Sequence, residues 1–384
     1  MYRIYADGEI LHNPLMADRG RIVVNPVLQE KLNTHGSLRF EIAPSNPLFE
    51  LIQPRNTQIR VVSDTNANNK PWFGRVVSVE RGWKNMKTVY CEGVLGHLCD
   101  SIFRPFVFKG SPAKLLEYLL TTYRGSTTRG PDMYPGNVSV TDPNDTIVRS
   151  SEEPLSVWET IENSLFDSSL GGYIIPRYDA DNDVHYVDYL SLDENDQYAR
   201  VSSQVVKFGR NLLDFTEYAS TQDVITVLIP YGAEVGTADP PSPGQNEMLP
   251  WDANRLTIES VNNGHRWIEN EAGKQMWGRI VGTYTWDDVT VPANLLTKAQ
   301  AYLAQQIWQS VTLEVSAVDL AFVNADIEQI QVGEYVRCQS VPHDMNLLLL
   351  CTEKTTYLTE LENSDIVLGA GLKTITDLQK RGAK

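Results

Sequence analysis

The stretch Asn211-Leu-Leu-Asp-Phe-Thr-Glu-Tyr-Ala-Ser-Thr-Gln-Asp-Val-Ile-Thr-Val-Leu-Ile-Pro-Tyr-Gly232 gives the clearest indication of the fold. Residues 224–229 are rich in valine, isoleucine and leucine, which is typical of a strand buried on both faces. Pro230 lacks a backbone donor and Gly232 permits a positive φ, so we expect the strand to end there. The pattern predicts a structural element and contains no catalytic motif.

The segments that follow indicate how the C-terminal half is divided. The run Asp239-Pro-Pro-Ser-Pro-Gly244 interrupts the strand pattern with rigid residues, which favours a domain boundary. A helix is predicted from about 292 to 309, because apolar side chains recur there at three- and four-residue steps. Strand patterns return after it. We therefore predict that 201–235 and 311–384 form one β-domain, into which an α+β domain of residues 236–310 is inserted.

The N-terminal part is predicted to be a β-domain of residues 1–107. Leu38, Phe40 and Ile42 alternate with polar residues, as in a strand with one buried face. Several short strands without a long helix predict a small barrel or sandwich. We expect turns at Asp7-Gly8, at 66–69 and at Asn85.

Residues 108–200 combine helical and strand periodicity. Ser111-Pro112 is a typical helix start, an apolar face follows it, and we expect Gly125 to end this helix. We predict a loop that contains Gly130-Pro131 and Pro135-Gly136, and then a second helix from Pro154. A hairpin with its turn at 179–183 follows, so this region is predicted to be an α+β domain. The apolar face of the first helix is expected to comprise Leu115, Leu116, Leu119, Leu120 and Tyr123.

Length and composition place limits on these domains. A chain of 384 residues exceeds the size at which one core usually stops growing, so two to four domains are expected. No apolar run approaches the roughly 18 residues of a membrane span, and the N-terminus lacks the blocks of a signal peptide. We expect a product folded in the cytosol, with four unpaired and buried thiols, because no C-x-x-C spacing occurs. These thiols belong to Cys91, Cys99, Cys338 and Cys351.

The net charge of −16 and the pI of about 4.8 argue against a surface that grips nucleic acid through phosphate contacts. Solubility alone accounts for such a charge.

The opening stretch resembles the centre of the siphophage tail-tip hub family, which forms the N-terminal structural region of phage minor structural and tail-associated lysin proteins. Further similar segments are spread in the same order along most of the chain. They are Gly36-Ser-Leu-Arg-Phe-Glu-Ile42, Asn46-Pro47, Trp72-Phe-Gly-Arg-Val-Val77, Cys91-Glu-Gly-Val-Leu-Gly-His-Leu98, Asn263-Gly-His-Arg-Trp-Ile268, Trp277-Gly-Arg-Ile280, Trp286-Asp-Asp-Val289, Val332-Gly-Glu-Tyr-Val-Arg337 and Ile366-Val-Leu-Gly369.

The resemblance implies a mixed, β-rich multidomain fold with two tail-tube-like β-barrel domains and two smaller α+β domains, one of them inserted into the second barrel. It implies a homotrimer whose six barrels continue or plug a six-fold tail tube. The implied partners are a distal tail protein hexamer, the tape-measure protein, receptor-binding or baseplate proteins, and DNA that passes through the lumen without specific binding. The implied location is the virion tail tip, assembled in the host bacterial cytoplasm, and an acidic lumen would keep DNA from adhering.

The sequence contains no strong motif for a metal site or a catalytic site. Asp179, Asp181, Asp183 and Asp188 surround His185, but an EF-hand loop needs glycine and a bidentate acid where Val184 and Leu190 stand, so a solvated hairpin turn is favoured. The six histidines lie in unrelated segments without a G-x-S-x-G or H-E-x-x-H motif, and His97 is expected to be a packed or capping residue. They are His12, His35, His97, His185, His265 and His343.

Two further patterns have structural interpretations. Glu152-Glu153 precede Pro154, where negative charge favours a helix N-terminus, and Asp287-Asp288 is typical of a turn, although paired carboxylates can serve glycoside hydrolysis. The tryptophans at 251, 267, 277 and 286 are spaced like core aromatics; sugar stacking would need two exposed, coplanar rings.

We therefore predict a non-enzymatic tail-tip hub with no cofactor, no metal and no catalytic residues. The alternatives are a tail-associated cell-wall hydrolase, either peptidase or glycosidase, and a carbohydrate- or receptor-binding module.

Overall fold

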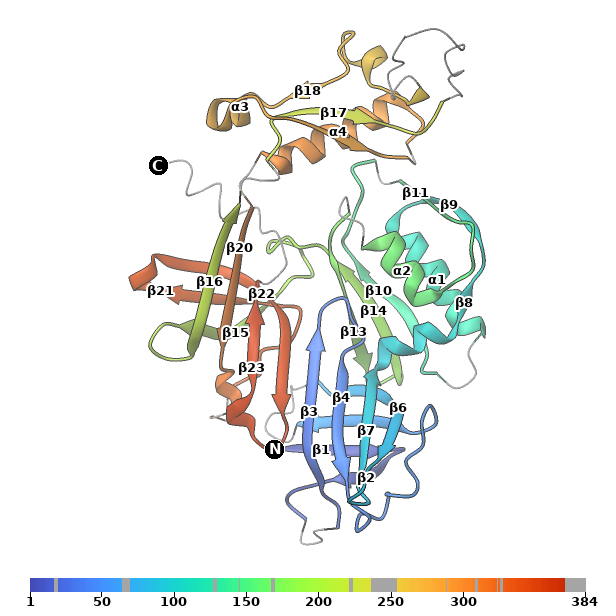
Figure 1. Ribbon diagram of the computed structural model, residues 1–384, viewed down its shortest axis with the longest axis vertical. Coiled ribbons are helices and arrows are strands. Elements are labelled where there is room, and N and C mark those ends of the chain that lie inside the picture. The colour runs from blue at the N-terminus through green and yellow to red at the C-terminus, as the bar shows by residue number, and fades with distance from the viewer. Residues whose placement is uncertain are drawn as a thin grey trace.

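The computed structural model describes the chain except residues 17–19, 64–69, 127–129, 145, 167–169, 221–223, 236–253, 288, 308–309, 323, 325–326 and 370–384. The run at 239–244, the turn at 66–69, Trp251, Asp288 and Trp308 therefore lie outside the described residues. Within these limits the molecule is rich in strands, and its helices lie in two places away from the main sheet (Figure 1). The predicted β-rich, mixed fold class is confirmed.

A first sheet module, defined as β1–β7, occupies the N-terminal part. Alternating side chains build it: in β4 the apolar residues Leu38, Phe40 and Ile42 are completely buried, whereas Ser37 and Arg39 are exposed. Asp7, Gly8 and Asn85 have positive φ, so these predicted turns are confirmed. The strands are β1 (Tyr2–Ala6), β2 (Glu9–His12), β3 (Val23–Lys31), β4 (Ser37–Ile42), β5 (Gln58–Ser63), β6 (Trp72–Arg81) and β7 (Lys87–Gly93).

A helical layer follows a 3₁₀ helix at Val94–Asp100. Helix α1 (Pro112–Ser126) buries its predicted face completely, and Gly125 lies inside its last turn rather than beyond its end. Helix α2 (Val157–Leu165) begins three residues later than predicted, because Ser156 and Glu159 form a capping box. Glu152-Glu153 therefore do not lie in its first turn. The short strands of this region are β8 (Ile102–Phe103), β9 (Phe106–Gly110), β11 (Ile147–Ser151) and β12 (Leu155–Ser156).

The predicted hairpin is present as β13 (Tyr173–Asp179) and β14 (Val184–Leu190), which pair antiparallel. The predicted loop at Pro135-Gly136 is instead a strand, β10 (Met133–Val138), which pairs parallel with β14. β10 lies at the edge of its sheet and its register is interrupted after Pro135, which is where a proline can be accommodated.

A second sheet module consists of β15, β16 and β20–β23. Its order, β16-β20-β23-β22-β21-β15, repeats the order β3-β4-β7-β6-β5-β1 of the first module. One difference is that β15 and β21 are parallel, whereas β1 and β5 are antiparallel. The strands are β15 (Arg200–Lys207), β16 (Leu212–Ser220), β20 (Ser310–Ala317), β21 (Glu334–Ser340), β22 (Met345–Tyr357) and β23 (Asp365–Leu368).

An outer layer stands between β16 and β20 in the sequence and lies at the end of the molecule far from the N-terminus (Figure 1). Its β17 pairs with β18 and β19, so the 227–231 segment shares a sheet with these strands and not with β16. The layer contains β17 (Val227–Tyr231), β18 (Ile268–Glu269), β19 (Val281–Thr285), α3 (Glu271–Trp277) and α4 (Pro292–Gln306). The four domain boundaries stay predictions.

Strand β17 ends at Tyr231, where the sequence predicts, but the two reasons expected for this end are wrong. Pro230 lies within the strand opposite Tyr284 of β19, while β18 pairs only with Val227 and Leu228, so the missing donor interrupts no ladder. Gly232 does not have a positive φ. A Cβ at this position would lie 2.6 Å from the Val289 carbonyl oxygen, so close packing against neighbouring backbone explains the glycine.

Candidate functional site

The joint between the two sheet modules is the feature that organises the molecule. The last residues of β22 pair antiparallel with β3, in a register that sets Glu353 opposite Lys31 and Tyr357 opposite Val27 (Figure 1). Beyond β22, Leu358 donates its amide to the carbonyl oxygen of Pro26 at 2.9 Å and is buried in the core of the first module. One strand thereby joins both modules into a single sheet.

A buried polar cluster lies beneath this joint. Lys354, 3% exposed, binds Asp319, 0% exposed, at 3.1 Å, and also donates to the Ile330 carbonyl oxygen at 2.7 Å. Gln204 of β15 and the amide of Ala321 donate to the same carboxylate at 2.6 and 3.0 Å. Burial alone would lower the pKa of Lys354, but the nearby charge of Asp319 outweighs it and raises that pKa.

A second cluster fixes the first module to the helical layer. The buried Arg75 donates to Glu92 at 2.7 Å and contacts Asp100 and the Gly96 carbonyl oxygen, which lie in and beside the 3₁₀ helix. His97 is buried next to Arg75, and desolvation lowers its pKa to about 4. The structure thus places His97 as a packed residue, as the sequence predicted.

The outer layer is attached by a buried ion pair. Lys298 of α4 lies 3.1 Å from Asp142, and both side chains are almost fully buried. Asn144, in the same loop as Asp142, donates to the Asn294 carbonyl oxygen at 3.3 Å. These contacts join α4 to a segment that precedes it by about 150 residues.

We expect Lys298→Met to lower the free energy of unfolding by about 3 kcal/mol, because it leaves the Asp142 carboxylate buried without its cation. In this variant, amide hydrogen exchange should accelerate more in the outer layer than in α1. Hydrogen exchange followed by mass spectrometry, with denaturation midpoints, measures both. Lys114→Met is the matched control, since Lys114 and Glu117 form an exposed pair whose loss should leave the denaturation midpoint nearly unchanged. Equal effects of the two substitutions would contradict the role given to the buried pair.

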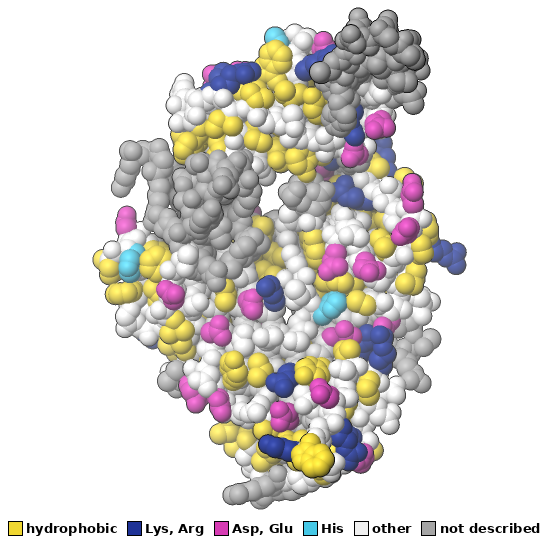
Figure 2. Space-filling view, in the orientation of Figure 1, with side chains coloured by type: hydrophobic (Ala, Val, Ile, Leu, Met, Phe, Trp, Pro, Cys, Tyr) yellow, Lys and Arg dark blue, Asp and Glu magenta, His cyan; other side chains and the backbone are white. Residues whose placement is uncertain are grey.

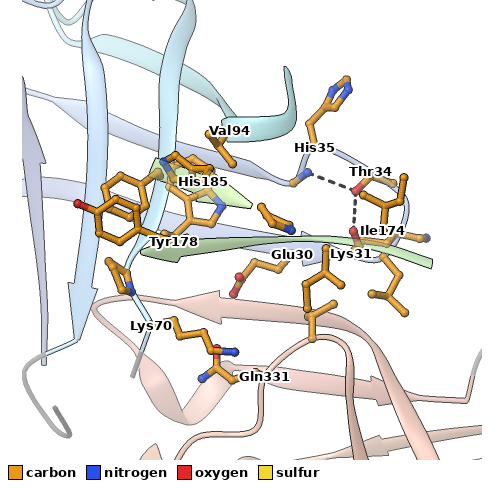
Figure 3. A pocket seen from close by; sticks show the side chains of 18 residues that line it. Glu30, Lys31, Thr34, His35, Lys70, Val94, Ile174, Tyr178, His185 and Gln331 are labelled. Carbon is orange, nitrogen blue, oxygen red and sulfur yellow. Dashed lines mark hydrogen bonds between the residues drawn. The ribbon is translucent and has the colours of Figure 1, made fainter. Parts of the chain in front are cut away.

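A cavity of about 120 Å³ lies where the β3–β4 turn, the start of β6, β13 and the 331–332 segment meet. Figure 3 shows Glu30, Lys70, Tyr178, His185 and Gln331 around it, so its lining comes from both modules and the hairpin. The volume suits a few water molecules and is smaller than typical small-molecule sites of about 300–1,000 Å³. The cavity therefore marks a junction and offers little room for a substrate.

The acidic hairpin residues do not converge on one point. Asp179 accepts bonds from the amides of Asp181 and Asn182, as in a turn, whereas Asp188 is buried and bound by Arg177 at 3.1 Å. His185 is buried against Phe73. No three His, Cys, Asp or Glu side chains of the described chain are grouped in a way that could hold a metal ion.

The other candidate residues are dispersed. Asp287 binds Arg255 in the outer layer, and Glu152 and Glu153 are exposed after β11. Trp286 is buried and Trp277 half-buried, so of the three described tryptophans among the four, only Trp267 is exposed.

The structure brings together two pairs that the sequence did not indicate. Cys99 Sγ lies 3.7 Å from His35 Nε2, and Cys99 is exposed, so the prediction that all four thiols are buried is wrong for this one. Burial nevertheless raises the pKa of Cys99 to about 11, which is opposite to the activation of a nucleophilic thiol. Ser340 Oγ lies 2.6 Å from His343 Nδ1, but the serine is 1% exposed.

No helix in the described part of the chain is long and apolar enough to span a membrane.

Comparisons with known proteins give a consistent result. Residues 200–379 match the family model described as Prophage endopeptidase tail. The search of curated proteins found no match.

Solved structures match over nearly the whole chain. The prophage tail protein gp18 of Listeria monocytogenes EGD-e is 12% identical, with 100% of this chain and 98% of that chain covered and a TM-score of 0.56. The tail protein of Neisseria meningitidis MC58 is 13% identical, with 98% and 99% covered and a TM-score of 0.58. The 43 kDa tail protein of prophage MuSo2 from Shewanella oneidensis is 10% identical, with 96% and 98% covered and a TM-score of 0.55. The chain has the fold of these tail proteins, and the resemblance predicted from its sequence is confirmed.

Proposed function

We propose that this chain is a structural protein of a phage or prophage tail tip, where three copies form a ring that continues or plugs the tail tube. One observation carries the proposal: a single chain contains two sheet modules with the same strand order, joined side by side by β22 and β3. Three copies would supply six such modules, so a trimer with threefold symmetry could match the sixfold symmetry of the tail tube.

The ring would dock on the distal tail protein hexamer and hold the tape-measure protein, and DNA would pass its lumen at infection. The acidic charge of −16 agrees with passage without adhesion. Figure 2 shows acidic and basic side chains of the described residues intermixed on one face of the molecule. The proposed location is the virion tail tip, after assembly in the bacterial cytoplasm.

A tail-associated peptidase is the second candidate, because the matching family is described by the word endopeptidase. The Cys99–His35 pair resembles a nucleophile and a base, and its thiol is exposed, whereas Ser340 of the Ser340–His343 pair is buried. The raised pKa of Cys99, to about 11, keeps this thiol protonated at neutral pH and therefore favours the structural function.

Mass measurement by sedimentation, with and without distal tail hexamers, tests the proposal. We expect three copies per particle, and one ring on each hexamer in electron micrographs. A particle that stays monomeric at high concentration and in the presence of the hexamer contradicts the proposal. Clearing of host peptidoglycan in a zymogram by this chain alone would favour the peptidase instead, and Cys99→Ser would show whether the exposed thiol is responsible.

A further inference from the structure

Two of the sheet edges that lack a strand partner among the described residues bear on the proposed ring. β16 pairs with β20 and presents its other edge unpaired. β6 pairs with β5 only through Trp72–Arg75, so the outer edge of its last residues is also unpaired. Exposed edges of this kind are templates for pairing with another chain.

The two modules can be aligned residue by residue through their strand pairing. In the first module Leu28, Leu38, Cys91 and Val76 stand in one row across four strands. In the second, the corresponding row is Phe215, Val315, Leu368 and Cys351. The register then shifts by one residue immediately after Val76 in β6 and immediately after Cys351 in β22. This register shift, which both modules share, fixes the alignment, because a bulge changes the face to which every following side chain points.

This alignment gives the two free edges defined counterparts. β16 corresponds to β3, and the end of β6 corresponds to the end of β22. Within one chain, β3 pairs with the end of β22 at the joint. The two free edges, β16 and the end of β6, are therefore the counterparts of two strands that pair with each other.

We infer that β16 of one copy pairs antiparallel with the end of β6 of the next copy, in the register of the β3–β22 joint. This inference rests on the proposed ring and specifies how it closes. The pairs Lys31–Glu353 and Gln29–Thr355 within the chain become Tyr218–Ser78 and Thr216–Glu80 between copies.

Two exposed apolar side chains support this register independently. Trp83 is fully exposed, and it corresponds to Leu358, which is 4% exposed in the core of the neighbouring module. Leu213 is 60% exposed, and it corresponds to Pro26, which is buried and whose carbonyl oxygen accepts a hydrogen bond from the Leu358 amide. The predicted pairing brings Trp83 of one copy into contact with Leu213 of the next, so both side chains would be buried in the interface.

Cysteine cross-linking tests the register directly. In a Cys99→Ser background, which removes the exposed native thiol, Glu80→Cys with Thr216→Cys should oxidise to covalent trimers on a non-reducing gel. The matched control is Gln29→Cys with Thr355→Cys, the corresponding pair of the intrachain joint, which should close within single chains. Glu80→Cys with Leu213→Cys is three residues out of register, about 10 Å along the strand, and should not cross-link.

The outcomes separate this inference from the proposed function. Trimers by mass in which the in-register pair stays reduced, or in which the shifted pair reacts equally, would overturn the edge pairing and leave the ring standing. A chain that is monomeric at every concentration, with and without distal tail hexamers, and that forms no cross-link overturns both.

Trp83→Ser provides a second readout. Because this side chain is fully exposed in the single chain, the substitution should leave the melting temperature unchanged and raise the concentration needed for half-assembly by tenfold or more, on the order of a hot-spot loss. Val107→Ser is the control, since Val107 is 83% exposed and lies in β9 beside the helical layer, outside both edge strands. Equal assembly of the two variants would contradict the placement of Trp83.

Discussion

Replacing Asp319 by alanine is expected to lower the free energy of unfolding by about 3–5 kcal/mol, a large share of the 5–15 kcal/mol typical of a folded protein. The loss would leave the buried Lys354 ammonium without the carboxylate that it binds and would remove one of the two acceptors of the Gln204 amide. Because Lys354 belongs to the strand that joins the two modules, both modules should lose stability together. Urea denaturation followed by tryptophan fluorescence would measure the change.

A double-mutant cycle distinguishes loss of the pair from loss of packing. Adding Lys354→Met to Asp319→Ala removes the orphaned charge and should restore part of the stability, because a buried pair can often be replaced by apolar side chains at little cost. Asp181→Ala, in the exposed hairpin turn, should change stability by less than about 0.5 kcal/mol. No recovery in the double variant would show that the ion pair is not the source of the effect.

Acidification is expected to produce the second large effect. Desolvation lowers the pKa of each of the buried His12, His97 and His185 to about 4 from 6.5. The unfolded chain therefore binds protons below pH 6.5 that the folded chain does not bind until about pH 4. The stability held at neutral pH should be lost as the pH falls through this window, by on the order of 3 kcal/mol per histidine.

Three carboxyl groups act in the opposite direction. Burial raises the pKa of Glu30, Glu334 and Asp365, so the folded chain takes up these protons more readily and gains some stability on acidification. The histidines should dominate because the pKa of each is lowered to about 4.

Denaturation midpoints measured at intervals between pH 7 and pH 4.5 would reveal the slope. His185→Phe keeps a ring against Phe73 and removes one titrating group, so its slope should be shallower than that of the parent chain. A midpoint that does not change across this window would contradict the assignment of neutral, buried histidines.

The parts of the fold that the sequence predicted well depend on local patterns. Helix α1 and the β13–β14 hairpin have strong periodicity within one segment, and both appear where expected. The start of α2 differs from the predicted Pro154 because the capping pair Ser156 and Glu159 sets it, and this pair is a local sequence signal.

The features that the sequence could not reveal depend on contacts between distant segments. The corresponding rows of the two modules share apolar character and no residue identities, so the repeat is visible only in the strand order and the pairing register. Strand β10 was missed because its partner β14 lies about 50 residues away. The Cys99–His35 pair likewise joins residues 64 positions apart, and no spacing rule could have indicated it.

The place of the outer layer has a consequence for the symmetry of the proposed ring. The first module connects β3 to β4 by a short turn, whereas the second opens the corresponding connection to admit β17–β19, α3 and α4. Six near-equivalent modules would therefore carry appendages only at every second position. One rim of the ring would present the sixfold pattern of a tube, while the other would present three evenly spaced binding positions. The tail tip would then have a direction, and proteins that bind this rim would do so in threes.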